Sequence, residues 1–167
     1  CLIQVLMYYL FIDMRQQQTE TIQSNLTNRA LQIQSKLEER VSVLNGISTF
    51  IETVGFQADA ATIEQYLSLT YQDLDQVYNV LIAPNGVITY VFPNENNKVI
   101  LHKSFFNPEL ADPDLIRETL TSQQITIENP RNLLQGGYAV IARKAIYTGN
   151  HFEGIVSIYL RIQDILN

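Results

Sequence analysis

The segment that begins at Gln16 contains neither proline nor glycine until Gly46, and its apolar residues recur with a helical period. Proline and glycine interrupt helices, so their absence predicts one long helix that ends near Thr53. The apolar spacing is about 3.67 residues per turn, and a strict heptad would place basic residues in the seam. The stripe therefore favours packing against a folded domain, or a nearly straight helix pair, over a left-handed coiled coil. Its members are Ile22, Leu26, Ala30, Ile33, Leu37, Val41, Leu44 and Ile51.

An apolar segment, Cys1–Ile12, precedes this helix and is interrupted only by Gln4 before the charged residues that follow. A membrane-spanning helix needs about 20 apolar residues, so the segment fits the outer half of one. Tyr8 and Tyr9 suit the membrane interface, where a ring is buried and its hydroxyl is hydrated. A buried core helix and the remains of a signal peptide are the alternatives, although no small-residue cleavage pattern follows Ile12. We assign residues 1–14 to the end of a transmembrane helix, 15–55 to a juxtamembrane dimerisation helix, and 56–167 to a folded domain.

The composition excludes several classes of protein. The chain of 167 residues has 46% hydrophobic residues, enough for a core, and its net charge of -6 with only 11 scattered basic residues argues against nucleic-acid binding. Cys1 is the sole cysteine, so neither an intrachain disulfide nor a cysteine-based zinc site is available. A lipoprotein also begins with cysteine, but here apolar residues follow in place of a polar linker.

The remainder of the chain alternates between helix and strand signals. Asn85-Gly86 joins two apolar runs and predicts a tight hairpin, because both positions tolerate positive φ. Asp112-Pro113 predicts a helix start, with an N-cap followed by proline at the first helical position. Together the signals predict an α+β, PAS-like fold, a five-stranded, mainly antiparallel sheet with a long N-terminal helix. The expected helices are 58–72 and 112–122, and the expected strands are 77–82, 87–92, 125–128, 137–147 and 152–161.

No motif in the sequence indicates catalysis, a cofactor or a metal. His102 and His151 lie in loop-like segments without acidic or cysteine partners at ligand spacing. Asp73 and Asp75 fall in a helix-to-strand connection, where solvated carboxylates are common. Nucleophile elbows, P-loops and dinucleotide fingerprints do not occur. We therefore predict a binding protein that is not an enzyme.

Aromatic and polar residues are expected on one face of the sheet. Strand alternation gives a shared orientation to residues two apart, and a mixture of tyrosine, serine and arginine is typical of a pocket for a small polar or anionic ligand. Arginine presents a planar fork of donors that suits a carboxylate. In the alternative reading the tyrosine hydroxyls only reach solvent, and Arg143 pairs with an acid such as Glu128. The predicted ligand-binding residues are Tyr78, Tyr90, Phe92, Asn97, Tyr138, Arg143 and Tyr147.

From Leu81 onward the chain resembles the CHASE family of extracellular sensor domains. The matching residues are Leu81-Ile-Ala-Pro-Asn-Gly-Val-Ile-Thr-Tyr-Val-Phe-Pro93, Asn97, Pro130, Leu133, Gln135-Gly-Gly137, Arg143, Phe152, Gly154 and Val156, over roughly half of the chain. The chain departs from the family pattern at His102, Ser104, Ala145 and Glu153.

The resemblance implies a PAS-like sensor domain, here residues 56–167, that lies outside the cell or in the periplasm. Two transmembrane helices would flank it in the inner or plasma membrane, the second shortly after Asn167. The output module would be a histidine kinase or an enzyme of cyclic-di-GMP turnover. Such receptors signal as homodimers, here through the N-terminal helix. A pilin-like structural subunit remains the alternative, although pilins carry an acidic residue within the apolar start and Cys1–Ile12 has none.

Overall fold

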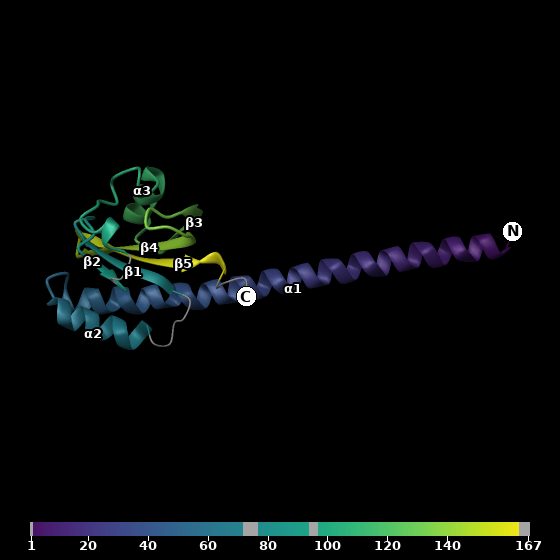
Figure 1. Cartoon of the computed structure of the whole chain (residues 1–167), viewed down its shortest axis with the longest axis horizontal. Coiled ribbons are helices and arrows are strands. Elements are labelled where there is room, and N and C mark those ends of the chain that lie inside the picture. Colours follow the sequence, from purple (N-terminus) through teal and green to yellow (C-terminus); the bar gives the residue numbers. More distant parts are fainter. Residues whose placement is uncertain (1, 72–76, 94–96, 164–167) are drawn as a thin grey trace. The chain divides into compact units, whose positions relative to one another are not determined.

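The computed structural model describes residues 2–71, 77–93 and 97–163 (Figure 1). Among these, the side chains of residues 2–6, 8–13 and 71 are outside the description, and with them the interfacial role predicted for Tyr8 and Tyr9. The chain divides into two compact units, Cys1–Leu37 and Glu38–Asn167.

The first unit is helical throughout its described residues. Helix α1, Leu2–Val54, confirms the predicted long helix and also includes the apolar start. Every residue from 14 to 32 is exposed, including the apolar Ile22 and Leu26 of the predicted stripe. Within the part of the chain that the structure describes, no helix combines the length and apolar character needed to cross a membrane.

The second unit contains a five-stranded antiparallel sheet in the order β2-β1-β5-β4-β3. The predicted α+β fold with a five-stranded antiparallel sheet is confirmed. Two further α-helices and a short 3₁₀ helix accompany the sheet. The elements are α2 Ala60–Tyr71, β1 Val77–Pro84, β2 Tyr90–Phe92, η1 Lys98–Ile100, α3 Pro113–Ser122, β3 Thr126–Asn132, β4 Tyr138–Thr148 and β5 His151–Arg161.

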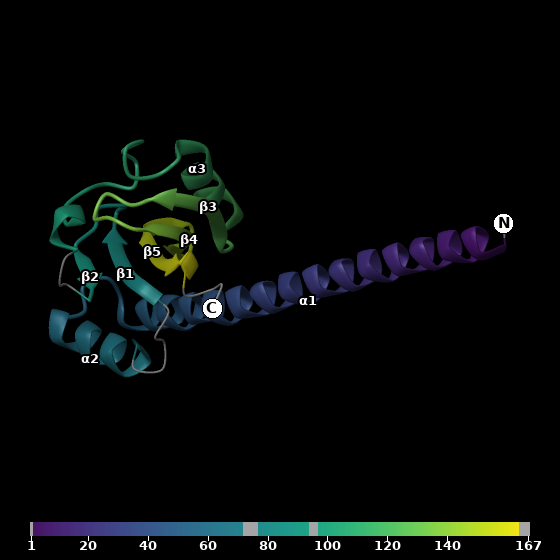
Figure 2. The same ribbon diagram turned by 45° about the vertical axis from the view of Figure 1, so that its right-hand side comes forward.

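One face of the sheet, which we call the helix face, is covered by α2 and by residues 38–54 of α1 (Figures 1 and 2). Lys144 of β4 reaches from this face to Glu52 of α1, with Nζ 3.4 Å from Oε1. The apolar residues that the two helices bury are Leu44, Ile47, Ile51, Ile63 and Leu67. The C-terminal part of the predicted stripe therefore packs on the domain.

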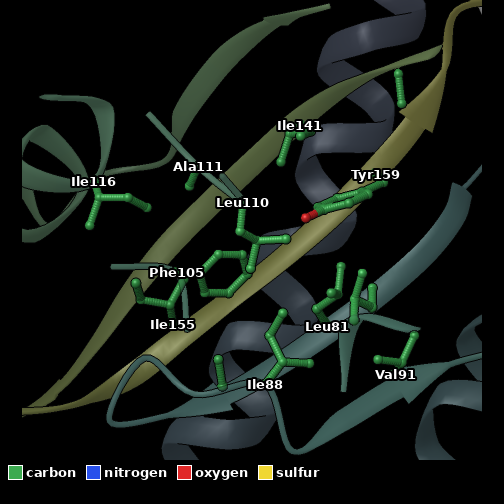
Figure 3. Packing of buried hydrophobic residues seen from close by; sticks show 13 residues of the cluster. Leu81, Ile88, Val91, Phe105, Leu110, Ala111, Ile116, Ile141, Ile155 and Tyr159 are labelled. Atoms are coloured by element: carbon green, nitrogen blue, oxygen red, sulfur yellow. The ribbon is translucent and has the colours of Figure 1, made fainter. Parts of the chain in front are cut away.

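The opposite face, which we call the Arg143 face, carries the main hydrophobic cluster (Figure 3). Residues 97–112, which precede α3, lie over it and contribute Phe105, Leu110 and Ala111, all buried. Helix α3 follows and is capped as predicted, because the Asp112 carboxylate accepts a hydrogen bond from the backbone N–H of Asp114. Burial of apolar side chains on both faces supplies the main stabilisation of the domain.

The hairpin after β1 has the predicted turn, with φ of 51° at Asn85 and 79° at Gly86. Strand β2 is shorter than predicted, since it begins at Tyr90 and not at Val87. Val87 instead forms an isolated bridge with Ser104, and Ile88 exchanges backbone hydrogen bonds with residues 102 and 103. The covering segment is thus tied to the hairpin by backbone hydrogen bonds.

Candidate functional site

Arg143 is the middle residue of β4 and is 1% exposed. It lies opposite Thr126 of β3 on one side and opposite Ser157 of β5 on the other. Its guanidinium carbon is 5.3 Å from the centroid of the Phe105 ring, a cation–π contact. Its Nη1 donates to Oε2 of Glu128, which is itself buried. The alternative in which Arg143 pairs with Glu128 is therefore what the structure contains.

A second arginine shares the same carboxylate. Arg131 donates from Nη1 to Oε1 of Glu128 at 3.0 Å, and it also donates to the carbonyls of Leu110 and Glu109 at 3.3 Å each. Two guanidinium groups and one carboxylate thus form a single cluster, which leaves one positive charge in excess. A buried charge is expensive unless it is paired, so the cluster favours the arrival of an anion.

Two of the three guanidinium nitrogens of Arg143, Nε and Nη2, are buried and have no hydrogen-bond acceptor in good geometry among the described residues. Together these two nitrogens form the side of the guanidinium that binds a carboxylate through two parallel hydrogen bonds. The cluster therefore presents a preoriented pair of buried donors, and the Tyr159 hydroxyl lies close to the same guanidinium.

Tyr159 of β5 adds a hydroxyl close to this cluster. The residue is 1% exposed, and burial raises the pKa of its phenol above the ordinary value of 10.0, an effect that the nearby charge of Arg143 partly offsets. The phenol is therefore neutral at physiological pH and able to donate or accept a hydrogen bond. Its ring belongs to the same cluster as Phe105 and Leu110 (Figure 3).

A pair of buried amides lies on the same face, next to Tyr159. Asn79 is directly opposite Tyr159 across β1 and β5, and its Nδ2 donates to Oδ1 of Asn97 at 2.9 Å. Asn97 in turn donates to the carbonyl of Pro93 at 2.9 Å. Oδ1 of Asn79 is buried and has no hydrogen-bond partner among the described residues. The face thus carries a buried acceptor as well as buried donors that lack partners among the described residues.

The prediction that Tyr90 and Phe92 share a face with Arg143 is wrong. Tyr90 pairs with Ile82, Ile82 with Val156, and Val156 with Lys144, so Tyr90 lies on the helix face with Lys144. Phe92 pairs with Val80, Val80 with Ile158, and Ile158 with Ala142, so Phe92 also lies on the helix face. The pKa of Tyr90 is raised by burial and by the nearby carboxylate of Glu64 on α2, which agrees with this placement.

Tyr138 also follows the orientation of the helix face, because it is two residues before Val140 and four before Ala142 on β4. It is 50% exposed and lies at the start of the strand. Its strand orientation therefore differs from that of Arg143, and its role in closing one side of that site stays a prediction.

Tyr78 and Tyr147 do lie on the Arg143 side. Between Val77 and Asn79, two residues of β1 oppose one residue of β5, which forms a β-bulge. The bulge turns Tyr78 toward the main cluster. The guanidinium carbon of Arg161 lies 5.2 Å from the centroid of the Tyr78 ring. The hydroxyl of Tyr147 donates to the carbonyl of Leu120 on α3 at 2.8 Å. The structure thus brings Tyr78, Asn97, Arg143 and Tyr147 to one side of the sheet.

The sequence did not single out Arg131, Phe105 or Asn79 as site residues. Arg131 follows Glu128 by three residues in a strand that Pro130 interrupts. This spacing was the feature of the sequence that could have indicated an ion pair between Arg131 and Glu128. Phe105 comes from a loop whose position over the sheet is not encoded locally. Among the described residues, no three His, Cys, Asp or Glu side chains gather in a group able to hold a metal ion.

Comparisons with known proteins place the fold among sensor domains. No protein-family model and no curated protein matches the chain. The solved structures that resemble it include the V. cholerae histidine kinase DctB sensor domain, with a TM-score of 0.64, 10% identity, and coverage of 86% of this chain and 55% of that chain. The ligand-binding domain of the Pseudomonas aeruginosa PAO1 amino acid chemoreceptor PctC, in complex with GABA, has a TM-score of 0.61 and 14% identity, and the match covers 83% of this chain and 58% of that chain.

A third similar structure is the sensory domain of the Campylobacter jejuni chemoreceptor Tlp3 with isoleucine bound, with a TM-score of 0.56 and 15% identity. That match covers 88% of this chain and 63% of that chain. The chain therefore spans less than two thirds of the length of each of these sensor domains. At such low identity the likeness establishes a PAS-like sensor fold, and assignment to the CHASE family stays a prediction.

Proposed function

We propose that this chain is the extracellular or periplasmic ligand-sensing domain of a transmembrane signalling receptor, and that its ligand is a small molecule with a carboxylate or another planar anion. The observation that carries the proposal is the buried Nε–Nη2 edge of Arg143, which has no acceptor in hydrogen-bond geometry among the described residues. This edge belongs to a cluster with one positive charge in excess. An anion that accepts a hydrogen bond from each of these two nitrogens satisfies both donors and neutralises the excess positive charge.

The fold supports the proposal from a second direction. The similar structures named above include domains in complex with GABA and with isoleucine, and both of these molecules carry a carboxylate. Asn79 Oδ1, an open acceptor on the same face, suits a donor group elsewhere on such a ligand. We therefore expect amino acids and small organic acids to be the first class to screen.

Signalling requires that the ligand site be coupled to the membrane. We expect the coupling to pass through β4, because Arg143 faces the site and the next residue, Lys144, is paired with Glu52 of α1. The N-terminal helix then links two copies of the domain and continues into the membrane, and a second span after Asn167 leads to a histidine kinase or cyclic-di-GMP output. A ligand shifts this system only if it binds the two signalling states with different affinity.

The test is a thermal-shift screen of amino acids and small organic acids on the wild-type domain. A ligand at one hundred times its dissociation constant stabilises a domain by about 2.7 kcal/mol, which is readily measured. Hits are then repeated on Arg143→Ala and on Arg117→Ala, a control that removes an exposed arginine of α3. We expect Arg143→Ala to abolish the shift and Arg117→Ala to preserve it.

One result of the same thermal-shift screen would contradict the site. A compound that stabilises wild type and Arg143→Ala to the same extent does not contact Arg143, and the Arg143–Glu128 pair would then be purely structural. If no acid in the screen stabilises the wild-type domain, the proposal of an anionic ligand is rejected.

A further inference from the structure

A compact turn, Asn107–Ala111, lies between η1 and α3 and is held together by its own hydrogen bonds. The N–H groups of Leu110 and Ala111 donate to the carbonyl of Asn107 at 2.9 and 3.2 Å, and the N–H of Glu109 donates to the Asn107 side chain at 3.0 Å. Because these bonds lie within the turn, the turn keeps its shape when its contacts with the sheet break. It can therefore move as a unit.

Only the last two residues of this turn are buried. Residues 106–109 are exposed, whereas Leu110 is 5% exposed and Ala111 is fully buried. Leu110 lies beside the Phe105 ring, and its side chain extends toward the hydroxyl of Tyr159 (Figure 3). Since Phe105 stacks on the guanidinium of Arg143, the turn closes over the region where an anion would reach Arg143.

Arg131 fastens the turn to the charged cluster. It donates to the carbonyls of Glu109 and Leu110 at 3.3 Å each, and the same guanidinium donates to Glu128 at 3.0 Å. Glu128 in turn accepts from Arg143. A continuous chain of charge-assisted hydrogen bonds therefore runs from the backbone of the turn to the proposed ligand site.

We infer that Asn107–Ala111 is a lid over Arg143 and that Arg131 is its latch. Arg131 is 31% exposed, so water competes for its long hydrogen bonds and the latch opens readily. An anion at Arg143 neutralises the excess positive charge of the cluster, which weakens the repulsion between the two guanidiniums and holds Arg131 in its closed position. The effect of the anion rests on the proposed function, whereas the latch itself does not.

Hydrogen exchange of the backbone amides in the full chain tests the latch without any ligand. We expect Arg131→Gln to accelerate exchange in residues 107–111 by about tenfold, because two hydrogen bonds that hold the turn are lost. Arg131→Lys keeps the charge without the planar fork and should give a smaller increase. Arg117→Gln is the matched control, since it removes an exposed arginine paired with Asp114 and should leave the turn unchanged.

Two outcomes overturn the latch. Exchange in residues 107–111 that is equal in wild type and Arg131→Gln would show that Arg131 does not hold the turn. An equal acceleration of hydrogen exchange in β5 would show that the variant loosens the whole domain and does not act on the lid alone.

Acetate, the simplest carboxylate, separates the latch from the proposed ligand. We expect acetate at high concentration to slow exchange in residues 107–111 of wild type but not of Arg143→Ala. A further outcome is that Arg131→Gln accelerates hydrogen exchange in residues 107–111 while acetate leaves exchange in wild type unchanged. That result supports the latch and rejects its coupling to an anion at Arg143. The screen described above then decides separately whether the domain senses an acid.

Discussion

Arg143 and Lys144 are consecutive residues of β4, yet each forms an ion pair on a different face of the sheet. Arg143 pairs with Glu128 on the face that carries the main hydrophobic cluster, and Lys144 pairs with Glu52 of α1 on the other. The first pair is buried, with side-chain exposures of 1% and 8%, and the second is partly exposed, with 20% and 39%. The two pairs should therefore respond very differently to the loss of one partner.

We expect Glu128→Gln to reduce the free energy of unfolding by about 3–5 kcal/mol, because it leaves the buried guanidinium of Arg143 without a counter-charge. Arg143→Met should be less damaging, since Glu128 retains Arg131. The double variant should be more stable than Glu128→Gln alone. Urea denaturation of wild type, both single variants and the double variant measures the coupling between the two residues.

Glu52→Gln is the matched control for that cycle. Its ion pair with Lys144 is partly exposed, so its loss should cost less than about 1 kcal/mol. If Glu128→Gln is as mild as Glu52→Gln, or if the effects of Glu128→Gln and Arg143→Met simply add, the buried cluster does not have the energetic role argued above.

Tyr159 should make the domain sensitive to alkaline pH. Burial raises the pKa of its phenol in the folded state above the ordinary value of 10.0, so the unfolded chain releases this proton first as the pH rises. The stability that the neutral phenol contributes is complete below pH 10 and is lost as the pH rises toward the folded pKa. Tyr159→Phe removes this loss of stability at alkaline pH. A smaller loss remains in the variant, because the pKa of Tyr90 is also raised.

The measurement is the urea midpoint of wild type and Tyr159→Phe between about pH 8 and 11. The midpoint of wild type should fall more steeply above pH 10 than that of Tyr159→Phe. Tyr138→Phe, at an exposed position, serves as the control and should follow wild type. Parallel curves for wild type and Tyr159→Phe would contradict the prediction.

Much of the fold was predictable because its signals are local. Asn85-Gly86 specifies its own turn through two positive φ angles, and Asp112-Pro113 specifies a helix start within three residues. The absence of proline and glycine before Gly46, together with the helical period of the apolar residues, predicted a long α1. In each case the relevant physical interaction lies within one or two turns of the chain.

The composition of the site was less predictable, because it depends on register between distant strands. The bulge at Tyr78 reverses its orientation relative to Tyr90, and no local signal marks a bulge at that position. The face of Tyr90 relative to Arg143 is set by pairing through β1, β5 and β4 in succession. An error of one residue in any of these registers moves a side chain to the other face.

Gly86 should tolerate substitution poorly for two separate reasons. Its φ is 79°, and a Cβ there would lie 2.4 Å from Cε2 of Phe106. Gly137 has a similar φ of 93° but no described atom within 4 Å of an added Cβ. Gly137→Ala thus measures the backbone strain alone, and Gly86→Ala should cost about 1–3 kcal/mol more because of the clash.

The double variant Gly86→Ala with Phe106→Ala isolates the clash. Removal of the Phe106 ring should recover most of the extra loss, so the double variant should be more stable than Gly86→Ala alone. Phe106 is 50% exposed, so its own truncation is mild. If Gly86→Ala and Gly137→Ala lower the free energy of unfolding equally, the Phe106 ring moves aside without cost and the clash argument fails.

The exposed stripe of α1 should mediate self-association of the chain. Every residue from 14 to 32 is exposed, and Leu26 is 62% exposed, so the apolar residues there have no cover within the described part of one chain. Burying them against the same stripe of a second copy removes apolar surface from water without placing the basic residues in the contact. We expect sedimentation equilibrium to show a dimer for wild type and a monomer for Leu26→Asp combined with Ile33→Asp. The matched control, Thr27→Asp with Ser35→Asp, adds the same charge beside the stripe and should remain dimeric. A wild-type chain that stays monomeric at high concentration, or a control that dissociates as fully as the stripe variant, would contradict this interface.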